Sequence, residues 1–141
     1  METVCILAEE RKITIPVEFR RELGREVIIS ARPTCLRVYS KEEWKKSENE
    51  WEKLPNGVKK RRFLRDMCSS AMEAKVDDLG RILVPIYLQK GDKVIIAKVN
   101  NYLEIWNEEN WQKRKEEKVI EIGANPTLKE IASKRGKRGE G

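Results

Sequence analysis

Four basic side chains near the start of the chain have the type and spacing to contact a nucleic acid. They form two adjacent pairs, Arg11 with Lys12 in "AEERKITIP" and Arg20 with Arg21 in "VEFRREL". Lysine and arginine bind phosphate oxygens, and arginine also contacts guanine edges. A turn followed by the start of a short helix would place these cations and helix N–H groups on one side, as a DNA backbone requires.

The same four side chains have a second interpretation, a solvated surface. Acidic side chains stand among them and could form local ion pairs, each worth well under about 1 kcal/mol. They are Glu9, Glu10, Glu18 and Glu22. From the residues alone, the solvated surface is the favoured interpretation.

Composition argues against an enzyme. The sequence contains no histidine, which removes Ser-His-Asp and Cys-His catalysis and histidine-containing zinc sites. The cysteines, Cys5, Cys35 and Cys68, are odd in number and widely spaced, so neither a disulfide framework nor a zinc site is indicated. Because no nucleophile with a base, phosphate-binding glycine loop or metal cluster is evident, we expect no cofactor, metal or small-molecule substrate.

The overall charge favours an anionic partner. A net charge of +6 and a pI near 9.3 fit a nucleic-acid or anionic surface. No apolar run approaches the roughly 18 residues of a membrane span, and the start "METVCILAEE" does not resemble a signal peptide. We therefore expect a soluble, cytosolic protein without a membrane partner.

The sequence of the elements that must position the basic residues occurs twice in the chain. "DDLGRILVP" repeats the apolar positions and the proline of "AEERKITIP", and the match continues once Glu22 and Leu23 are treated as an insertion. Pro16 then aligns with Pro85, Gly24 with Gly91, Leu36 with Leu103, and Trp44 with Trp111. Such self-similarity indicates an internal duplication. Each copy, roughly forty residues, is small for independent folding, so we expect the copies to interlock with each other, as a pseudo-twofold unit, or with another chain.

The first copy contains clear helix and strand signals. Strands are expected at 3–7 and 12–15, as a hairpin, and at 25–30 and 35–40. Pro16 can begin a short helix that Gly24 ends. Ser40 and Glu43 have the capping-box spacing and predict the start of the next helix.

The segment "VKKRRFLRDMCSSA" predicts a helix between the copies. Its apolar residues Leu64, Met67, Cys68 and Ala71 recur at helical spacing. Arg62 and Arg65 point away from that stripe. They could follow a phosphate backbone or simply be solvated, and the two interpretations are about equally supported.

With these features in place, the chain resembles the MraZ family of bacterial transcription regulators, which carry two tandem swapped-hairpin, AbrB-like (SpoVT-AbrB) units. The resemblance covers about residues 1–115. It lies in "CLRVYSKEEW", "RRFLRDMCSSAMEAKVDDLGR" and "YLEIWNEENW", and in a D-x-x-x-R pattern formed by Asp77 and Arg81.

The resemblance implies an α+β, mainly β fold in which the two tandem AbrB-like units form one pseudo-twofold β-barrel, with short helices and a helical linker. The expected boundaries are 1–54 for the first unit, 55–70 for the linker, 71–118 for the second unit and 119–141 for a C-terminal helix and tail. The tail ends in the basic, glycine-rich "SKRGKRGEG", which we expect to be disordered.

The resemblance also implies a function. It predicts a sequence-specific DNA-binding transcriptional regulator, a repressor of division and cell-wall genes, in the cytoplasm at the nucleoid. The implied partners are double-stranded DNA with direct repeats in a promoter, and further copies of the chain in a ring-shaped homo-oligomer. With it, DNA contact becomes the favoured interpretation of Lys12, Arg20 and Arg21, with Arg11 beside them.

The two copies depart from each other in their polar residues. The family pattern has an aspartate and an arginine in both copies, but the first copy has Ala8 and Lys12 there. In the second copy, Asp77 and Arg81 are expected to fix a turn that contains Gly80, although Arg81 could also reach DNA. Arg20 and Arg21 match the paired arginines of simpler AbrB-type units, whereas the second copy has Gln89 and Lys90.

A second class of function stays open at this point. The same barrel could serve as an antitoxin-like protein-interaction module, with a tail that sequesters a partner protein. The basic tail without apolar anchors argues against this, because an inhibitory segment needs apolar side chains to fill a groove.

Overall fold

The computed structural model describes residues 2–85 and 88–124, with side chains up to Glu116 in the last helix. The chain divides into two compact units, Met1–Asn107 and Glu108–Gly141. Within the described residues, no helix combines the length and apolar character needed to cross a membrane. The predicted basic tail lies outside the described residues.

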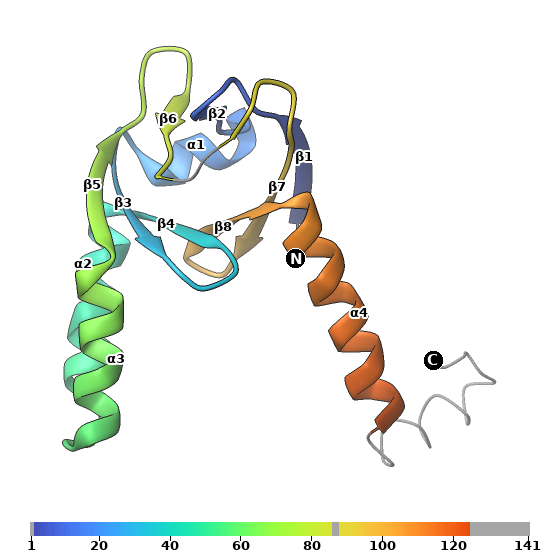
Figure 1. The fold of residues 1–141 in the computed structure, drawn as a ribbon. Coiled ribbons are helices and arrows are strands. Elements are labelled where there is room, and N and C mark those ends of the chain that lie inside the picture. Colours follow the sequence, from blue (N-terminus) through green and yellow to red (C-terminus); the bar gives the residue numbers. More distant parts are fainter. Residues whose placement is uncertain (1, 86–87, 125–141) are drawn as a thin grey trace. The chain divides into compact units, whose positions relative to one another are not determined.

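The first unit contains eight strands and three helices among the described residues (Figure 1). In chain order they are β1 (Glu2–Leu7), β2 (Lys12–Thr14), α1 (Val17–Leu23), β3 (Glu26–Ala31), β4 (Leu36–Ser40), α2 (Lys41–Glu52), α3 (Val58–Ser69), β5 (Ala71–Lys75), β6 (Arg81–Leu83), β7 (Lys93–Val99) and β8 (Tyr102–Asn107). Among the described residues, the second unit contains the helix α4 (Glu108–Ala124).

The sheet pairing exchanges strands between the copies. Six strands form one sheet in the order β1-β7-β8-β4-β3-β5, and β2 pairs with β6 in a separate two-stranded ribbon. The first strand of each copy pairs with a strand of the other, β1 with β7 and β5 with β3. The local hairpin expected between β1 and β2 is wrong, because β1 pairs with β7 and β2 pairs with β6. The α+β swapped-hairpin fold is confirmed.

Strand register places a pseudo-twofold axis through the unit. In the β2–β6 ribbon, Ile13 lies opposite Ile82, and these two residues are equivalent in the sequence duplication. In the main sheet, Arg37 lies opposite Glu104, and these are also equivalent. Where a residue faces its own equivalent, the symmetry axis must pass between the two. The duplicated sequence therefore folds as two interlocked halves.

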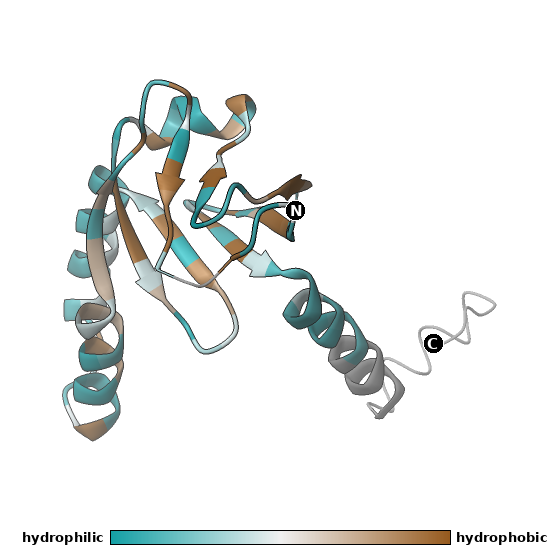
Figure 2. Cartoon of the chain, turned by 45° about the horizontal axis from the view of Figure 1, so that its top comes forward, coloured by the Kyte–Doolittle hydropathy of each residue, from teal (hydrophilic) through white to brown (hydrophobic). Residues whose placement is uncertain are grey.

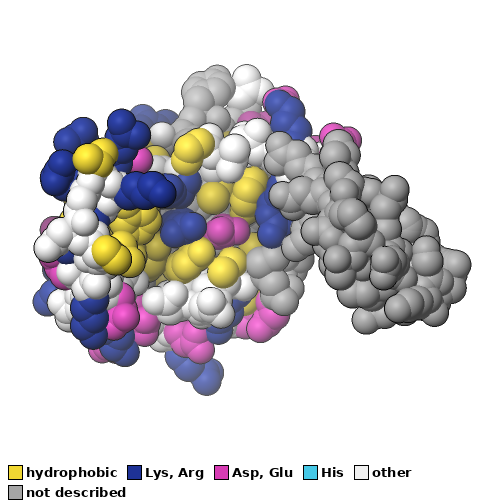
Figure 3. Space-filling view, turned by 90° about the horizontal axis from the view of Figure 1, so that it is seen from below, with side chains coloured by type: hydrophobic (Ala, Val, Ile, Leu, Met, Phe, Trp, Pro, Cys, Tyr) yellow, Lys and Arg dark blue, Asp and Glu magenta, His cyan; other side chains and the backbone are white. Residues whose placement is uncertain are grey.

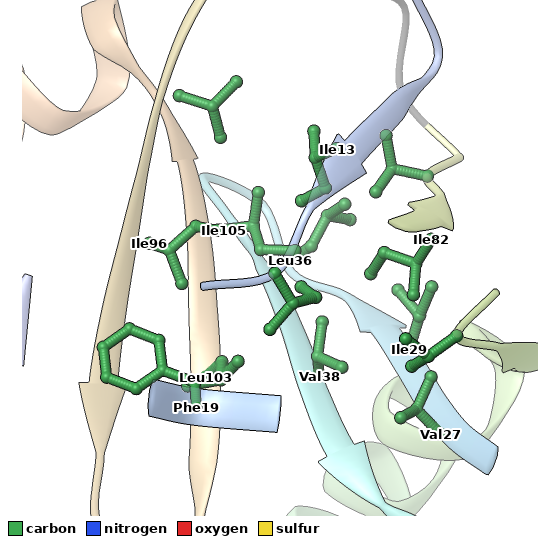
Figure 4. Packing of buried hydrophobic residues seen from close by; sticks show 14 of the residues in the cluster. Ile13, Phe19, Val27, Ile29, Leu36, Val38, Ile82, Ile96, Leu103 and Ile105 are labelled. Carbon is green, nitrogen blue, oxygen red and sulfur yellow. The ribbon is translucent and has the colours of Figure 1, made fainter. Parts of the chain in front are cut away.

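The core is built from equivalent residues of the two copies. Alternate positions on β3, β4, β7 and β8 point inward, as the two-residue period of a strand requires, and the ribbon closes over them (Figure 4). The buried equivalents are Ile13 with Ile82, Ile15 with Val84, Phe19 with Leu88, Val27 with Val94, Ile29 with Ile96, Leu36 with Leu103, and Val38 with Ile105. In Figure 2 the strands carry most of the brown, apolar segments, and the helices are mostly teal.

The short helices begin and end as the sequence predicts. Pro16 precedes α1, and the backbone N–H of Gly24 donates to the carbonyl of Arg20 at its end. Ser40 Oγ accepts a hydrogen bond of 3.0 Å from the backbone N–H of Glu43 at the start of α2. The inserted residue Leu23 is buried in the core, so the insertion adds apolar contacts to the first copy.

An aromatic cluster packs α2 and α3 against the outer face of the sheet. Trp44 lies edge-on to Tyr39 and to Trp51, with ring centroids 5.1 and 5.2 Å apart. The ring centroids of Phe63 and Trp51 lie 5.4 Å apart. Met67 is fully buried in the same cluster. The predicted apolar stripe on α3 is therefore partly wrong. Cys68 is exposed, and Ala71 belongs to β5, although it still packs against the aromatic cluster.

Candidate nucleic-acid interface

The predicted basic residues of the first copy lie at the ribbon end of the unit, where β2, β6 and α1 meet (Figure 1). We call the turn at residues 8–11 the first turn and the turn at residues 77–80 the second turn. Each turn is bonded to the backbone of the other copy. The N–H of Ile15 donates to Gly80 O at 2.8 Å, and the N–H of Val84 donates to Arg11 O at 2.9 Å. One compact end thus carries both turns.

The second turn is stabilised by one carboxylate. Asp77 Oδ1 accepts the backbone N–H groups of Leu79 at 2.9 Å and Arg81 at 2.8 Å. Its Oδ2 accepts the side-chain Nε of Arg81 at 2.9 Å. The backbone N–H of Gly80 donates to Asp77 O at 2.9 Å. This is the hydrogen-bonding pattern by which an aspartate side chain stabilises a turn.

These contacts hold the pKa of Asp77 below its ordinary value, mainly because the backbone N–H of Arg81 favours the ionised carboxylate. The ionised group contributes stability above the unfolded pKa of about 4, and that contribution is lost as pH falls through the lower folded pKa. We therefore expect wild type to lose more stability than Asp77→Asn between about pH 5 and pH 3. Urea unfolding at both pH values measures this, and equal acid losses would contradict it.

The first turn has no such carboxylate. Ala8 occupies the equivalent of Asp77 and is buried in the core. Instead, backbone hydrogen bonds to the second copy stabilise this turn. The N–H of Ala8 donates to Asp92 O and the N–H of Gly91 donates to Ala8 O, both at 2.8 Å. Glu10 has a positive φ of 60°. The exchange of aspartate for alanine therefore replaces a side-chain turn with one held by backbone hydrogen bonds.

Two of the predicted DNA contacts use their guanidinium groups within the chain. Arg81 bonds Asp77, and its Nη1 lies 3.9 Å from Glu9 Oε1. Arg20 is partly buried, and its Nε donates to Ile15 O at 2.9 Å. Neither guanidinium is fully available to a phosphate group.

Other basic side chains at the same end lack a side-chain hydrogen bond or ion pair among the described residues. They are Arg11, Lys12 and Arg21, all exposed, together with Lys90, which sequence analysis did not name as a contact. We call these four side chains the free cations. Lys90 precedes Gly91, whose N–H bonds Ala8 in the first turn. The sequence duplication offered a signal for it, because Lys90 aligns with Arg21.

Nearby carboxylates are largely occupied by other partners. Glu22 pairs with Lys98 at 2.6 Å, Asp78 pairs with Arg25, and Glu9 Oε2 accepts a bond from Thr14 at 3.3 Å. The solvated-surface interpretation named Glu9, Glu10, Glu18 and Glu22 as local partners of the basic side chains. Glu9 and Glu22 have other partners, whereas Glu10 and Glu18 are exposed and form no ion pair with the free cations among the described residues.

The other predicted contacts, Arg62 and Arg65, do not join this surface. They lie on the exposed face of α3 with Arg61, and α3 extends away from the ribbon end (Figure 1). Figure 3, which views the molecule from below, shows dark blue side chains gathered around yellow ones on its left side. Lys60 is different, because its Nζ donates to Glu52 O at 2.7 Å and to Asn56 Oδ1 at 3.2 Å and so joins α2 to α3.

The fold and the ribbon end define a duplicated, swapped-strand β protein with a candidate nucleic-acid surface. The MraZ family, described as antitoxin-like, matches residues 3–66 and again 67–127. "Transcriptional regulator MraZ" of Caldicellulosiruptor saccharolyticus is 36% identical over 123 residues, covering 83% of this chain and 86% of that protein. The protein of the same name from Thermoanaerobacter pseudethanolicus is 40% identical over 72% of this chain and 75% of its own length. This chain belongs to the MraZ family.

Proposed function

We propose that this chain is a sequence-specific DNA-binding transcriptional regulator that acts in the cytoplasm at the nucleoid. The observation that carries the proposal is that Arg11, Lys12, Arg21 and Lys90 lie exposed at one end of the β unit, without a side-chain hydrogen bond or ion pair among the described residues. The relatives' name, transcriptional regulator, supports it. Phosphate contacts of this kind would fix the register of the protein on DNA, and a base-reading arginine would add specificity.

In this proposal the copies have different tasks. The first copy supplies most of the cations, Arg11, Lys12 and Arg21. The second copy supplies the stiff turn fixed by Asp77. Cations on a stiff support lose less conformational entropy on binding than cations on a mobile loop. We therefore assign DNA contact mainly to the first copy and support mainly to the second.

A nuclease footprint on DNA upstream of the protein's own gene tests the proposal. We expect protection of short direct repeats, with occupancy that falls steeply as salt rises because each phosphate contact releases counterions. A repressor would lower transcription from that promoter in a purified system. Uniform, sequence-independent protection, or none at low salt, would contradict sequence-specific regulation. Inhibition of a captured toxin enzyme without a footprint would favour the antitoxin-like alternative.

We also propose that the protein acts as a ring-shaped homo-oligomer. Support comes from the edge strands β1 and β5 and from exposed apolar side chains at the surface, among them Leu7 and Val17, which are 62% and 70% exposed. Unpaired strand edges and apolar surface favour association, and a ring requires two different faces of one chain to meet. We expect light scattering at micromolar concentration to give a mass of several protomers. A monomer mass would contradict the proposal.

A further inference from the structure

Beside the β2–β6 ribbon, the two copies form one pair of equivalent backbone hydrogen bonds, but their side-chain contacts there differ. The bond from Ile15 N–H to Gly80 O and the bond from Val84 N–H to Arg11 O are equivalent under the pseudo-twofold axis. At the side-chain level, the equivalent of Arg20 is Gln89 and the equivalent of Gly80 is Arg11. Any contact between Arg20 and Gly80 therefore has no counterpart on the other side.

Arg20 and Gly80 do form such a contact. Arg20 is held by its Nε, which donates to Ile15 O at 2.9 Å, while the N–H of the same residue, Ile15, donates to Gly80 O at 2.8 Å. A β-carbon added to Gly80 would collide with the Arg20 guanidinium at Cζ, Nη1 and Nε. Arg20 of the first copy thus lies directly against the backbone of the second turn.

Gly80 meets two separate requirements. Its φ of +80° belongs to the left-handed region that favours glycine, and the space where a side chain would stand is filled by Arg20. Gly91 provides a comparison within the same chain. Its φ is +92°, but an added β-carbon there would meet nothing within 4 Å. Backbone strain and collision can therefore be separated by experiment.

We propose that Arg20 and Gly80 form a one-sided latch between the copies, and that Arg20 is a positioning residue for DNA binding rather than a DNA contact. The latch holds the second turn, and with it the β2–β6 ribbon, in the position from which the free cations reach phosphate. It cannot form on the other side, because Arg11 carries a side chain where Gly80 has none, and Gln89 has no guanidinium. The positioning role of Arg20 rests on the proposed function, whereas the latch itself does not.

A thermodynamic cycle in the absence of DNA tests the latch itself. The variants are Arg20→Gln, which carries the residue of the second copy, Gly80→Ala, and their combination. Gly91→Ala, made alone and together with Arg20→Gln, is the matched control for backbone strain. We expect Gly80→Ala to lower the melting temperature more than Gly91→Ala does in wild type, and the two glycine changes to cost the same in the Arg20→Gln background. Strictly additive losses would overturn the latch.

Salt titrations on DNA from upstream of the gene test the positioning role. We expect Arg20→Gln and Gly80→Ala each to weaken binding by about tenfold, with no change in the slope of log K against log salt. A direct phosphate contact would instead lower the slope by about one for Arg20→Gln and leave Gly80→Ala with wild-type binding, which would overturn the positioning role. If wild type itself fails to bind, the proposed function fails, and the unfolding cycle still decides the latch.

Discussion

Replacing Ile82 by alanine is expected to lower the free energy of unfolding by about 2–5 kcal/mol. Ile82 is 1% exposed and lies opposite Ile13, which is fully buried, at the point where the pseudo-twofold axis crosses the β2–β6 ribbon. Truncation leaves a cavity between the ribbon and the sheet that both copies line. Because domains of this size have a total stability of roughly 5–15 kcal/mol, the double change Ile13→Ala and Ile82→Ala is expected to leave most of the chain unfolded.

Denaturant unfolding of the single variants measures this prediction, and Leu83→Ala is the matched control. Leu83 is the next residue on β6 but is 51% exposed, so its truncation should cost little. Symmetry adds a second expectation, that Ile13→Ala and Ile82→Ala have similar costs. A loss for Ile82→Ala no greater than that for Leu83→Ala would contradict the assignment of the ribbon to the shared core.

Most of the fold could be predicted because the chain contains two copies of the same structural unit. Pro16 and Gly24 located the short helix, and their alignment with Pro85 and Gly91 located the duplication. The pairing of equivalent core residues follows from a symmetry axis. Strand partners could not be predicted from local signals. The run 3–7 followed by 12–15 is typical of a hairpin, but both strands pair with the other copy, since only exchange lets each half cover the other's apolar face.

The candidate site was predicted less completely, and for a physical reason. Sequence spacing treats Arg20 and Arg21 alike, as adjacent cations on one helix. They differ because the helix turns one toward Gly80 and the other outward, so that Arg20 is partly buried and Arg21 is exposed. Arg81 is likewise engaged by Asp77. Which cation stays free depends on the turn of the opposite copy, and no local pattern contains that information.

The triple change Arg11→Ala, Lys12→Ala and Arg21→Ala is expected to lower operator affinity by on the order of a thousandfold, about tenfold for each lost charge-assisted contact. These side chains form no intramolecular ion pair or side-chain hydrogen bond among the described residues, so the variant should keep its melting temperature and its oligomeric mass. The slope of log K against log salt should fall by roughly three per protomer.

The matched control is Arg61→Ala, Arg62→Ala and Arg65→Ala, which removes the same formal charge from the exposed face of α3. If affinity depended only on net charge, both triple variants would lose binding equally and show the same change in slope. Because α3 extends away from the ribbon end, a protomer seated on DNA through β2 and α1 should not bring α3 to the same phosphates. We expect the control to keep a near wild-type slope. The reverse result, in which the α3 variant fails to bind and the ribbon-end variant binds normally, would move the DNA surface to α3 and contradict the division of tasks between the copies.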